Sequence, residues 1–110
     1  MEVKFNGGSG RSYAYHHHVV PMIAMDGPAN YLIVRKTDTG FSPLFAGECP
    51  NLAAEYQSEA MMHAWERAKS IYHATDILTH ESSVDELERQ REVQDLIRGL
   101  RPTMNSPKAA

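Results

Sequence analysis

The chain has 110 residues, of which 42% are hydrophobic and 23% are charged, a composition that is ordinary for a folded domain and excludes a largely disordered chain. Its net charge of −3 at pH 7 gives no overall positive field that would attract nucleic acid. Cys49 is the single cysteine, and no apolar run approaches the roughly 20 residues of a membrane span. We therefore expect one cytoplasmic domain over residues 1–105, a flexible tail at 106–110 and no membrane partner.

Turn-forming residues near the start of the chain indicate a β-hairpin. Val3 and Phe5 lead into the glycine-rich stretch 6–10, which tolerates positive φ angles and a tight reversal, and an alternating aromatic pattern begins at Tyr13. The segment 19–28 mixes proline and glycine with apolar residues, a composition typical of a packed loop that leads into the next strand.

The continuous apolar run at 31–34 predicts a strand that is buried on both faces, and it is the best candidate for the central strand. Turn residues at 37–40 predict a reversal into an antiparallel partner strand at 42–47. A further short strand is expected at 75–79.

The apolar spacing changes to a helical period after Asn51, with Met61, Trp65 and Tyr72 on the expected core face. The stretch 83–86 matches a capping box and predicts that a last helix begins near Ser83. We expect an α/β (α+β) fold with a short mixed or antiparallel central sheet, an N-terminal hairpin and about three flanking helices. The inward stripe predicted for the last helix contains Leu87, Val93, Leu96, Ile97 and Leu100.

An ordered set of short motifs carries a resemblance to a known family. The pieces are Tyr31 at the end of a glycine-containing approach, the stretches 44–48, 51–52, 95–97 and 101–102, and Asn105. Together they resemble a GIY-YIG nuclease domain, and with the opening hairpin and the stretches 62–65 and 73–75 the likeness covers nearly the whole chain. The order of strands and helices that the resemblance implies agrees with the order predicted from the residue pattern.

The resemblance implies a degenerate active site. The tyrosine that helps to deprotonate the attacking water corresponds to Tyr31, but the second motif tyrosine falls on Phe45, which has no hydroxyl. The arginine that polarises phosphate falls on Glu55, and the metal-binding glutamate falls on Val93, which cannot coordinate Mg²⁺. The vestigial site implied by the resemblance comprises Tyr31, Phe45, Gly47, Glu55, His63, Val93 and Asn105.

The loss of the metal ligand and of the cation is expected to abolish phosphodiester cleavage, because each supports the transition state by several kcal/mol. Glu92 is next to Val93, but the two lie about 100° apart on a helix, and we expect Glu92 to turn aside from the site. No cofactor and no metal are therefore expected, and Mg²⁺ enters only if the chain is a nuclease.

Two further features suggest chemistry but are more simply structural. His16 and His18 could share one metal ion, since alternate residues of a strand point to the same face. Cys49 lies shortly before a predicted helix start, where a helix dipole could lower a thiol pKa. No histidine partner for it is evident in the sequence, so a nucleophilic role is not favoured.

Three functional hypotheses follow. The first, which we prefer, is a non-catalytic binding module, or pseudo-nuclease, whose former active face binds protein, including a second copy of itself. The second is a weak or divergent metal-dependent endonuclease or phosphodiesterase that uses Tyr31, His63, Glu48 and Glu92. The third is a nucleic-acid binder without cleavage, which the net charge disfavours. The cations available to it are Arg35, Lys36, Arg67, Lys69 and Arg98.

Overall fold

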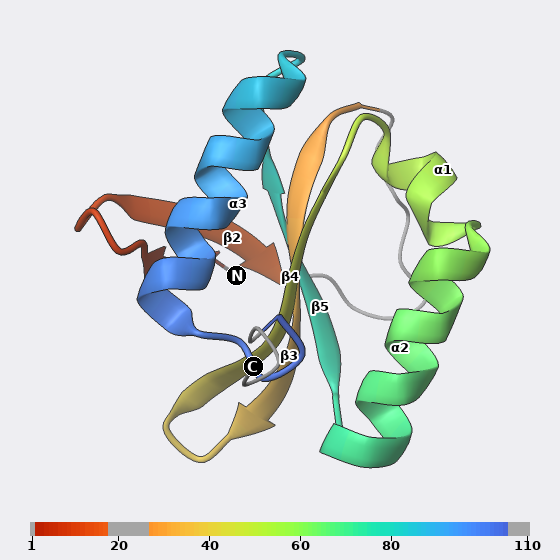
Figure 1. The fold of residues 1–110 in the computed structure, drawn as a ribbon. Coiled ribbons are helices and arrows are strands. Elements are labelled where there is room, and N and C mark those ends of the chain that lie inside the picture. Colours follow the sequence, from red (N-terminus) through yellow and green to blue (C-terminus); the bar gives the residue numbers. More distant parts are fainter. Residues whose placement is uncertain (1, 18–26, 106–110) are drawn as a thin grey trace, which may run out of the picture.

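The computed structural model describes residues 2–17 and 27–105. Its strands are β1 (Glu2–Asn6), β2 (Ser12–His17), β3 (Ala29–Thr37), β4 (Gly40–Cys49) and β5 (Asp76–Glu81), and its helices are α1 (Leu52–Tyr56), α2 (Glu59–Tyr72) and α3 (Glu86–Leu100). The strands form one five-stranded sheet in the order β1-β2-β5-β3-β4, and every neighbouring pair is antiparallel. Helix α3 covers one face and α1 with α2 covers the other (Figure 1). The predicted fold class, hairpin and three helices are confirmed.

Two predictions fall wholly or partly outside the described residues. The tail at 106–110 is one, and most of the loop at 19–28 is the other. In the part of the chain that the structure describes, no helix combines the length and the apolar composition needed to cross a bilayer.

Strand β3 is buried along its first six residues, from Ala29 to Val34. It pairs with β4 on one side and β5 on the other, so that Tyr31 lies opposite Gly47 and Thr79. The predicted pairing of 31–34 with 42–47 is therefore confirmed. The prediction that this run is the central strand is wrong in detail: β5 is the middle strand, because the hairpin joins the sheet through β2 and β5.

The helical region after Asn51 divides into two helices, and each has its own N-cap. The Asn51 side chain accepts a hydrogen bond from the Ala54 amide at the start of α1. The Ser58 side chain accepts one from the Met61 amide at the start of α2. These caps satisfy amide groups that have no partner inside the helix.

The last helix begins near Ser83, as predicted, but the predicted capping box at 83–86 is wrong. Asp85 is the N-cap of α3, and its carboxylate accepts a hydrogen bond from the Leu87 amide at 3.0 Å. The Ser83 hydroxyl instead accepts from the Asp85 amide at 3.0 Å, two residues before the helix N-cap. Leu87 is consequently 63% exposed and does not belong to the inward stripe.

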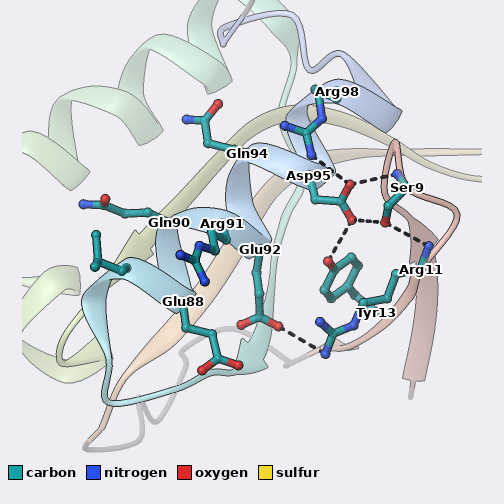
Figure 2. A pocket seen from close by; sticks show the side chains of 11 residues that line it. Ser9, Arg11, Tyr13, Glu88, Gln90, Arg91, Glu92, Gln94, Asp95 and Arg98 are labelled. Atoms are coloured by element: carbon teal, nitrogen blue, oxygen red, sulfur yellow. Dashed lines mark hydrogen bonds and ion pairs between the residues drawn. The ribbon is translucent and has the colours of Figure 1, made fainter.

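The Asp95 carboxylate of α3 holds the hairpin turn against the helix (Figure 2). It accepts hydrogen bonds from the Ser9 amide at 2.8 Å, the Ser9 hydroxyl at 2.7 Å and the Tyr13 hydroxyl at 2.8 Å. A Cβ atom on Gly7 would lie 2.1 Å from that carboxylate, and one on Gly99 would lie 2.5 Å from the hairpin backbone. The close approach of hairpin and helix thus requires glycine at both positions.

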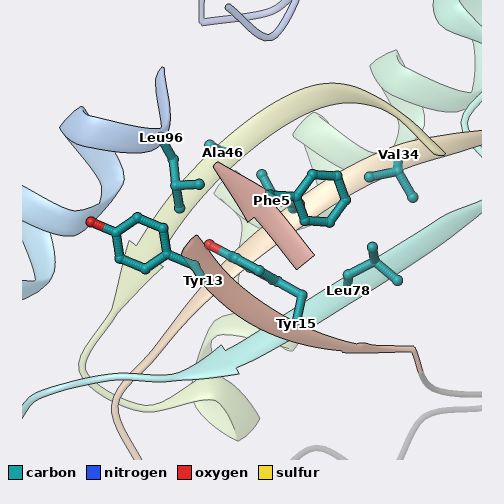
Figure 3. Close-up of a cluster of buried hydrophobic side chains, with 8 residues drawn as sticks. Phe5, Tyr13, Tyr15, Val34, Ala46, Leu78 and Leu96 are labelled. Carbon is teal, nitrogen blue, oxygen red and sulfur yellow. The ribbon is translucent and has the colours of Figure 1, made fainter. Parts of the chain in front are cut away.

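The sheet separates two apolar clusters, because alternate residues of β3 point to opposite faces. Leu32 and Val34 face α3, whereas Tyr31 and Ile33 face α1 and α2. The cluster beneath α3 (Figure 3) contains Phe5, Tyr13, Tyr15, Leu32, Val34, Ala46, Leu78 and Leu96. The cluster beneath α1 and α2 contains Ala29, Tyr31, Ile33, Cys49, Leu52, Met61 and Ala68.

Candidate functional site

The structure brings four of the seven predicted site residues together on the α1 and α2 side of the sheet. The Tyr31 ring lies over Gly47, where a Cβ atom would be 2.5 Å from the Tyr31 hydroxyl oxygen. The centroids of the Tyr31 and Phe45 rings are 6.1 Å apart. The Tyr31 hydroxyl donates a hydrogen bond to Glu55 Oε2 at 3.1 Å. We call these four residues the Tyr31 cluster.

The surroundings of Tyr31 keep its hydroxyl protonated. Burial raises the pKa of Tyr31 well above its ordinary value of 10.0, and the negative charge of Glu55 and the hydrogen bond to it raise that pKa further. A phenol in this state is a hydrogen-bond donor and cannot accept a proton from water at neutral pH. Its donor is already directed at Glu55, so Tyr31 itself cannot act as the general base of a hydrolysis.

Cys49 is buried in the same apolar cluster as Tyr31, on the α1 and α2 side of the sheet. Its sulfur lies 3.6 Å from the Ala29 carbonyl oxygen, to which the thiol donates. Burial raises the pKa of Cys49 to about 11, and the charge of Glu55 contributes to the increase. The suggestion that a helix dipole lowers this pKa is therefore wrong. Burial and the nearby carboxylate outweigh any effect of the five-residue helix α1.

Arg89 of α3 is the one buried cation among the described residues. Its hydrogen bonds go to a carboxylate and to backbone carbonyl oxygens of the same fold. Its Nε donates to Glu48 Oε2 at 2.8 Å. Its Nη1 donates to the Ser83 and Val84 carbonyl oxygens at 3.1 and 3.0 Å. Arg89 thus neutralises Glu48 and fastens the segment before α3. The sequence analysis missed it because it lies in a run of charged residues, which is typical of a solvated helix face.

The other three predicted site residues lie elsewhere. His63 is exposed on α2. Val93 is buried on α3, which packs on the opposite face of the sheet from the Tyr31 ring (Figure 1). Asn105 accepts a hydrogen bond from the Ala46 amide at 2.6 Å and donates one to the Ala46 carbonyl at 2.9 Å. Asn105 therefore covers the outer edge of β4 and has a structural role.

The position that the resemblance assigns to the metal ligand cannot bind Mg²⁺. Val93 and Phe45 offer no oxygen ligand, and the Glu48 carboxylate is bound to Arg89. Within 2–17 and 27–105, no group of three or more His, Cys, Asp or Glu side chains is arranged to hold a metal. The suggested pair of His16 and His18 cannot be assessed, since His18 lies outside the described residues.

Glu92 lies apart from the Tyr31 cluster, but it is buried, so the expectation that it points away from the inward face of α3 is wrong. It is 7% exposed, and its carboxylate accepts a hydrogen bond from the Ser82 hydroxyl. Its Oε2 lies 3.6 Å from His80 Nε2 and 4.0 Å from the Arg11 guanidinium. The physical reason is the width of the inward face of α3, which includes both Glu92 and Val93. Polar groups at the end of β5 supply the partners that a buried carboxylate needs.

A row of polar side chains crosses the sheet beneath α3, on the far side from the Tyr31 ring. Asn30 lies opposite Glu48 on β4 and His80 on β5, and the Tyr15 and His80 ring centroids are 5.3 Å apart. Both amide atoms of Asn30 and the hydroxyl of Tyr15 are buried, and they make no hydrogen bond within the described residues. The sequence offers one signal for this row, namely a polar Asn30 inside an apolar strand.

An open pocket of about 770 Å³ lies between the hairpin and α3 (Figure 2). The Arg11 guanidinium lies 5.1 Å from the centroid of the Tyr13 ring, and Arg98 contacts Asp95 at 3.3 Å. Three basic and three acidic side chains line the pocket, so it presents no net positive field to a phosphate chain. Its charged lining consists of Arg11, Arg91, Arg98, Glu88, Glu92 and Asp95.

Comparison with known proteins gives no match to this chain: no family model, no curated protein and no solved structure is significantly similar to it.

Proposed function

We propose that the chain is a non-catalytic binding module on a GIY-YIG-like scaffold. The observation that carries the proposal is the hydrogen bond from Tyr31 to Glu55. At the position where the resemblance implies a cation that binds phosphate, this chain has a carboxylate, and that carboxylate accepts the hydrogen bond of the tyrosine hydroxyl. The succession β3, β4, α1, α2, β5 and α3, which is the order that the resemblance implies, supports the choice of scaffold.

Charge and chemistry at the Tyr31 cluster favour a protein ligand over a nucleic acid. Glu55 adds negative charge where cleavage of a phosphodiester requires positive charge, and the nearest buried cation is bound to Glu48. Phe45 is only partly buried and packs beside Tyr31. The partly exposed Phe45 ring, close to the partly exposed Glu55 carboxylate, suits a neutral or basic protein surface. The single buried thiol, Cys49, supports a reducing compartment such as the cytoplasm.

The geometry gives less support to the two alternatives. A divergent nuclease would need Tyr31, His63 and Glu92 in one place, but Glu92 lies in the polar row beneath α3 and His63 is exposed on α2. A nucleic-acid binder would need clustered cations. The available ones are divided among β3, α2 and α3, and the Lys69 ammonium lies over the Trp65 ring at 5.7 Å.

A nicking assay on supercoiled plasmid DNA tests the proposal. The purified native chain, incubated with Mg²⁺ or Mn²⁺, is expected to leave the plasmid intact, and calorimetric titration with either ion is expected to show no saturable binding. Tyr31→Phe is the matched control, since it removes only the hydroxyl. Metal-dependent nicking by the native chain that disappears in Tyr31→Phe would overturn the proposal and favour the nuclease alternative.

A further inference from the structure

The two edge strands of the sheet differ in whether their outer backbone groups are hydrogen-bonded. At the β4 edge, Asn105 bonds to the backbone of Ala46, and the Met104 amide donates to the Leu44 carbonyl at 2.7 Å. Strand β1 forms the other edge and has β2 as its sole neighbour in the sheet. Within the described residues, nothing pairs with the outer side of β1. An uncovered edge presents a row of backbone donors and acceptors to another strand.

The hairpin turn determines which residues of β1 direct their backbone groups outward. The Gly7 amide donates to the Arg11 carbonyl at 2.9 Å. Alternate residues of an antiparallel strand bond to the same neighbour, so Val3 and Phe5 bond to β2. The amides and carbonyls of Glu2 and Lys4 therefore point away from the sheet.

Helix α3 closes one end of this edge. A Cβ atom on Gly99 would lie 2.5 Å from the Asn6 carbonyl oxygen, so the helix backbone covers the outward carbonyl at the end of β1. The open part of the edge thus ends before Asn6. Glu2 and Lys4 are the residues that can bond to an added strand. Both side chains are exposed, and neither forms an ion pair with another described residue.

We propose that a second copy of the chain pairs antiparallel with β1, so that two five-stranded sheets join into one across a two-fold axis. In such a pair, directly opposed residues share a face of the sheet. An even-numbered residue of one copy therefore always lies opposite an even-numbered residue of the other. One register sets Glu2 against Lys4 of the second copy, twice, with Val3 opposite its own copy. The two other registers set either Lys4 or Glu2 against its own copy.

Charge and backbone access both select the first register. Opposite charges that face each other across strands stabilise the pair, and like charges destabilise it. The register that opposes the two lysines also needs the outward carbonyl of Asn6, which Gly99 covers. An edge lysine normally discourages strand addition. In the favoured register each Lys4 faces Glu2 of the other copy. Lys4 therefore disfavours pairing with an unrelated strand but favours pairing with a second copy of β1. The contact is short, which predicts a weak and reversible dimer.

Analytical ultracentrifugation with charge-swap variants tests this inference. The native chain is expected to show a reversible monomer–dimer equilibrium up to about 1 mM protein, the range of weak association. Lys4→Glu and Glu2→Lys are each expected to weaken dimerisation at least severalfold, because like charges then face each other. The variant that carries both changes is expected to recover native association, and Lys36→Glu, an exposed lysine on β3, is the charge-matched control with native behaviour.

Lys4→Pro provides a second test, since it removes an outward amide that bonds to nothing within the described residues. It is expected to abolish the dimer, while circular dichroism confirms the monomer fold. A native chain that remains monomeric at about 1 mM, or a dimer that ignores the charge swap, would overturn the inference. The inference concerns the β1 edge and not the Tyr31 cluster, so nicking and sedimentation results test the two proposals separately.

Discussion

The Tyr31 hydroxyl and the Glu55 carboxylate are joined by a hydrogen bond of 3.1 Å across the space between β3 and α1. A tyrosine and a carboxylate in this relationship stabilise each other only while the tyrosine is protonated. The bond therefore links the ionisation of a buried phenol to the charge of a residue that the resemblance aligns with an arginine. This link can be measured directly.

Glu55→Gln is expected to lower the pKa of Tyr31. The substitution removes the negative charge and weakens the hydrogen bond, and both of these raise the native value. Burial is the largest cause of the raised pKa and remains, so Tyr31 should still ionise above its ordinary value of 10.0. Alkaline titration of ¹³C-tyrosine resonances measures the shift. Glu59→Gln, at an exposed position on α2, is the control, and an unchanged Tyr31 titration in Glu55→Gln would contradict the role given to Glu55.

Asp95 is expected to make the domain sensitive to acid. The Ser9 hydroxyl hydrogen bond lowers the pKa of Asp95 to about 2, against the opposing effect of burial, and the Tyr13 and Ser9 amide bonds assist. Because the folded pKa is below the ordinary value of 3.8, the stabilisation is fully present above that pH. It is lost as the pH falls toward 2.

Asp95→Asn removes this titration and is expected to cost about 1.5 to 3 kcal/mol at neutral pH, the range for hydrogen bonds to charged groups. Urea unfolding measured at several acidic pH values tests both effects. The loss of stability with falling pH should be shallower in Asp95→Asn than in the native chain. Asp38→Asn, in the exposed β3–β4 turn, should retain the native slope, and equal slopes in all three proteins would refute the assignment.

For Gly99→Ala, helix propensity predicts a gain in stability, whereas packing predicts a loss. Alanine is favoured over glycine inside a helix by about 1 kcal/mol. The added Cβ atom, however, would meet backbone atoms of Asn6, Gly7 and Gly8 at 2.5, 2.6 and 2.7 Å. Backbone shifts of this kind cost about 1 to 3 kcal/mol, so we expect net destabilisation in thermal unfolding. A higher melting temperature would show that the hairpin can move away from α3 without loss.

The arrangement of β3 and β4 could be predicted from the sequence, because a β-branched apolar run is followed by turn residues and a second run. The hairpin was predictable for the same reason. The N-cap of α3 was not, since Ser83 and Asp85 both have side chains that can cap a helix. Which of them does so depends on the path of the chain as it leaves β5, and this path is set by tertiary contacts such as that of Arg89 with the Ser83 carbonyl.

The burial of Glu92 shows why the candidate site was only partly predictable. Periodicity along α3 placed Val93 inward correctly, but it carries no information on what the sheet offers to a neighbouring carboxylate. His80 and Ser82 supply that information, and they come close to Glu92 only after β5 pairs with β3. In contrast, Tyr31 and Gly47 were brought together by a strand pairing that the sequence indicated.

The two buried tyrosines beneath α3 give a matched test of hydrogen bonding. The Tyr13 hydroxyl donates to Asp95 at 2.8 Å, whereas the Tyr15 hydroxyl has no partner within the described residues. Phenylalanine has nearly the same shape, so each substitution removes little more than a hydroxyl. Tyr13→Phe is expected to cost about 1.5 to 3 kcal/mol, because it takes one donor away from a buried carboxylate.

Tyr15→Phe is expected to be neutral or stabilising, because it removes a buried polar atom that the fold leaves unpaired. Urea unfolding of both variants beside the native chain at neutral pH measures the difference, and near-ultraviolet circular dichroism verifies that Phe5 still packs against the ring at position 15. If Tyr15→Phe instead lost as much stability as Tyr13→Phe, the Tyr15 hydroxyl would have a partner in solution. The polar row of Asn30, His80 and Tyr15 would then be a hydrated or ligand-bound site rather than an unpaired one.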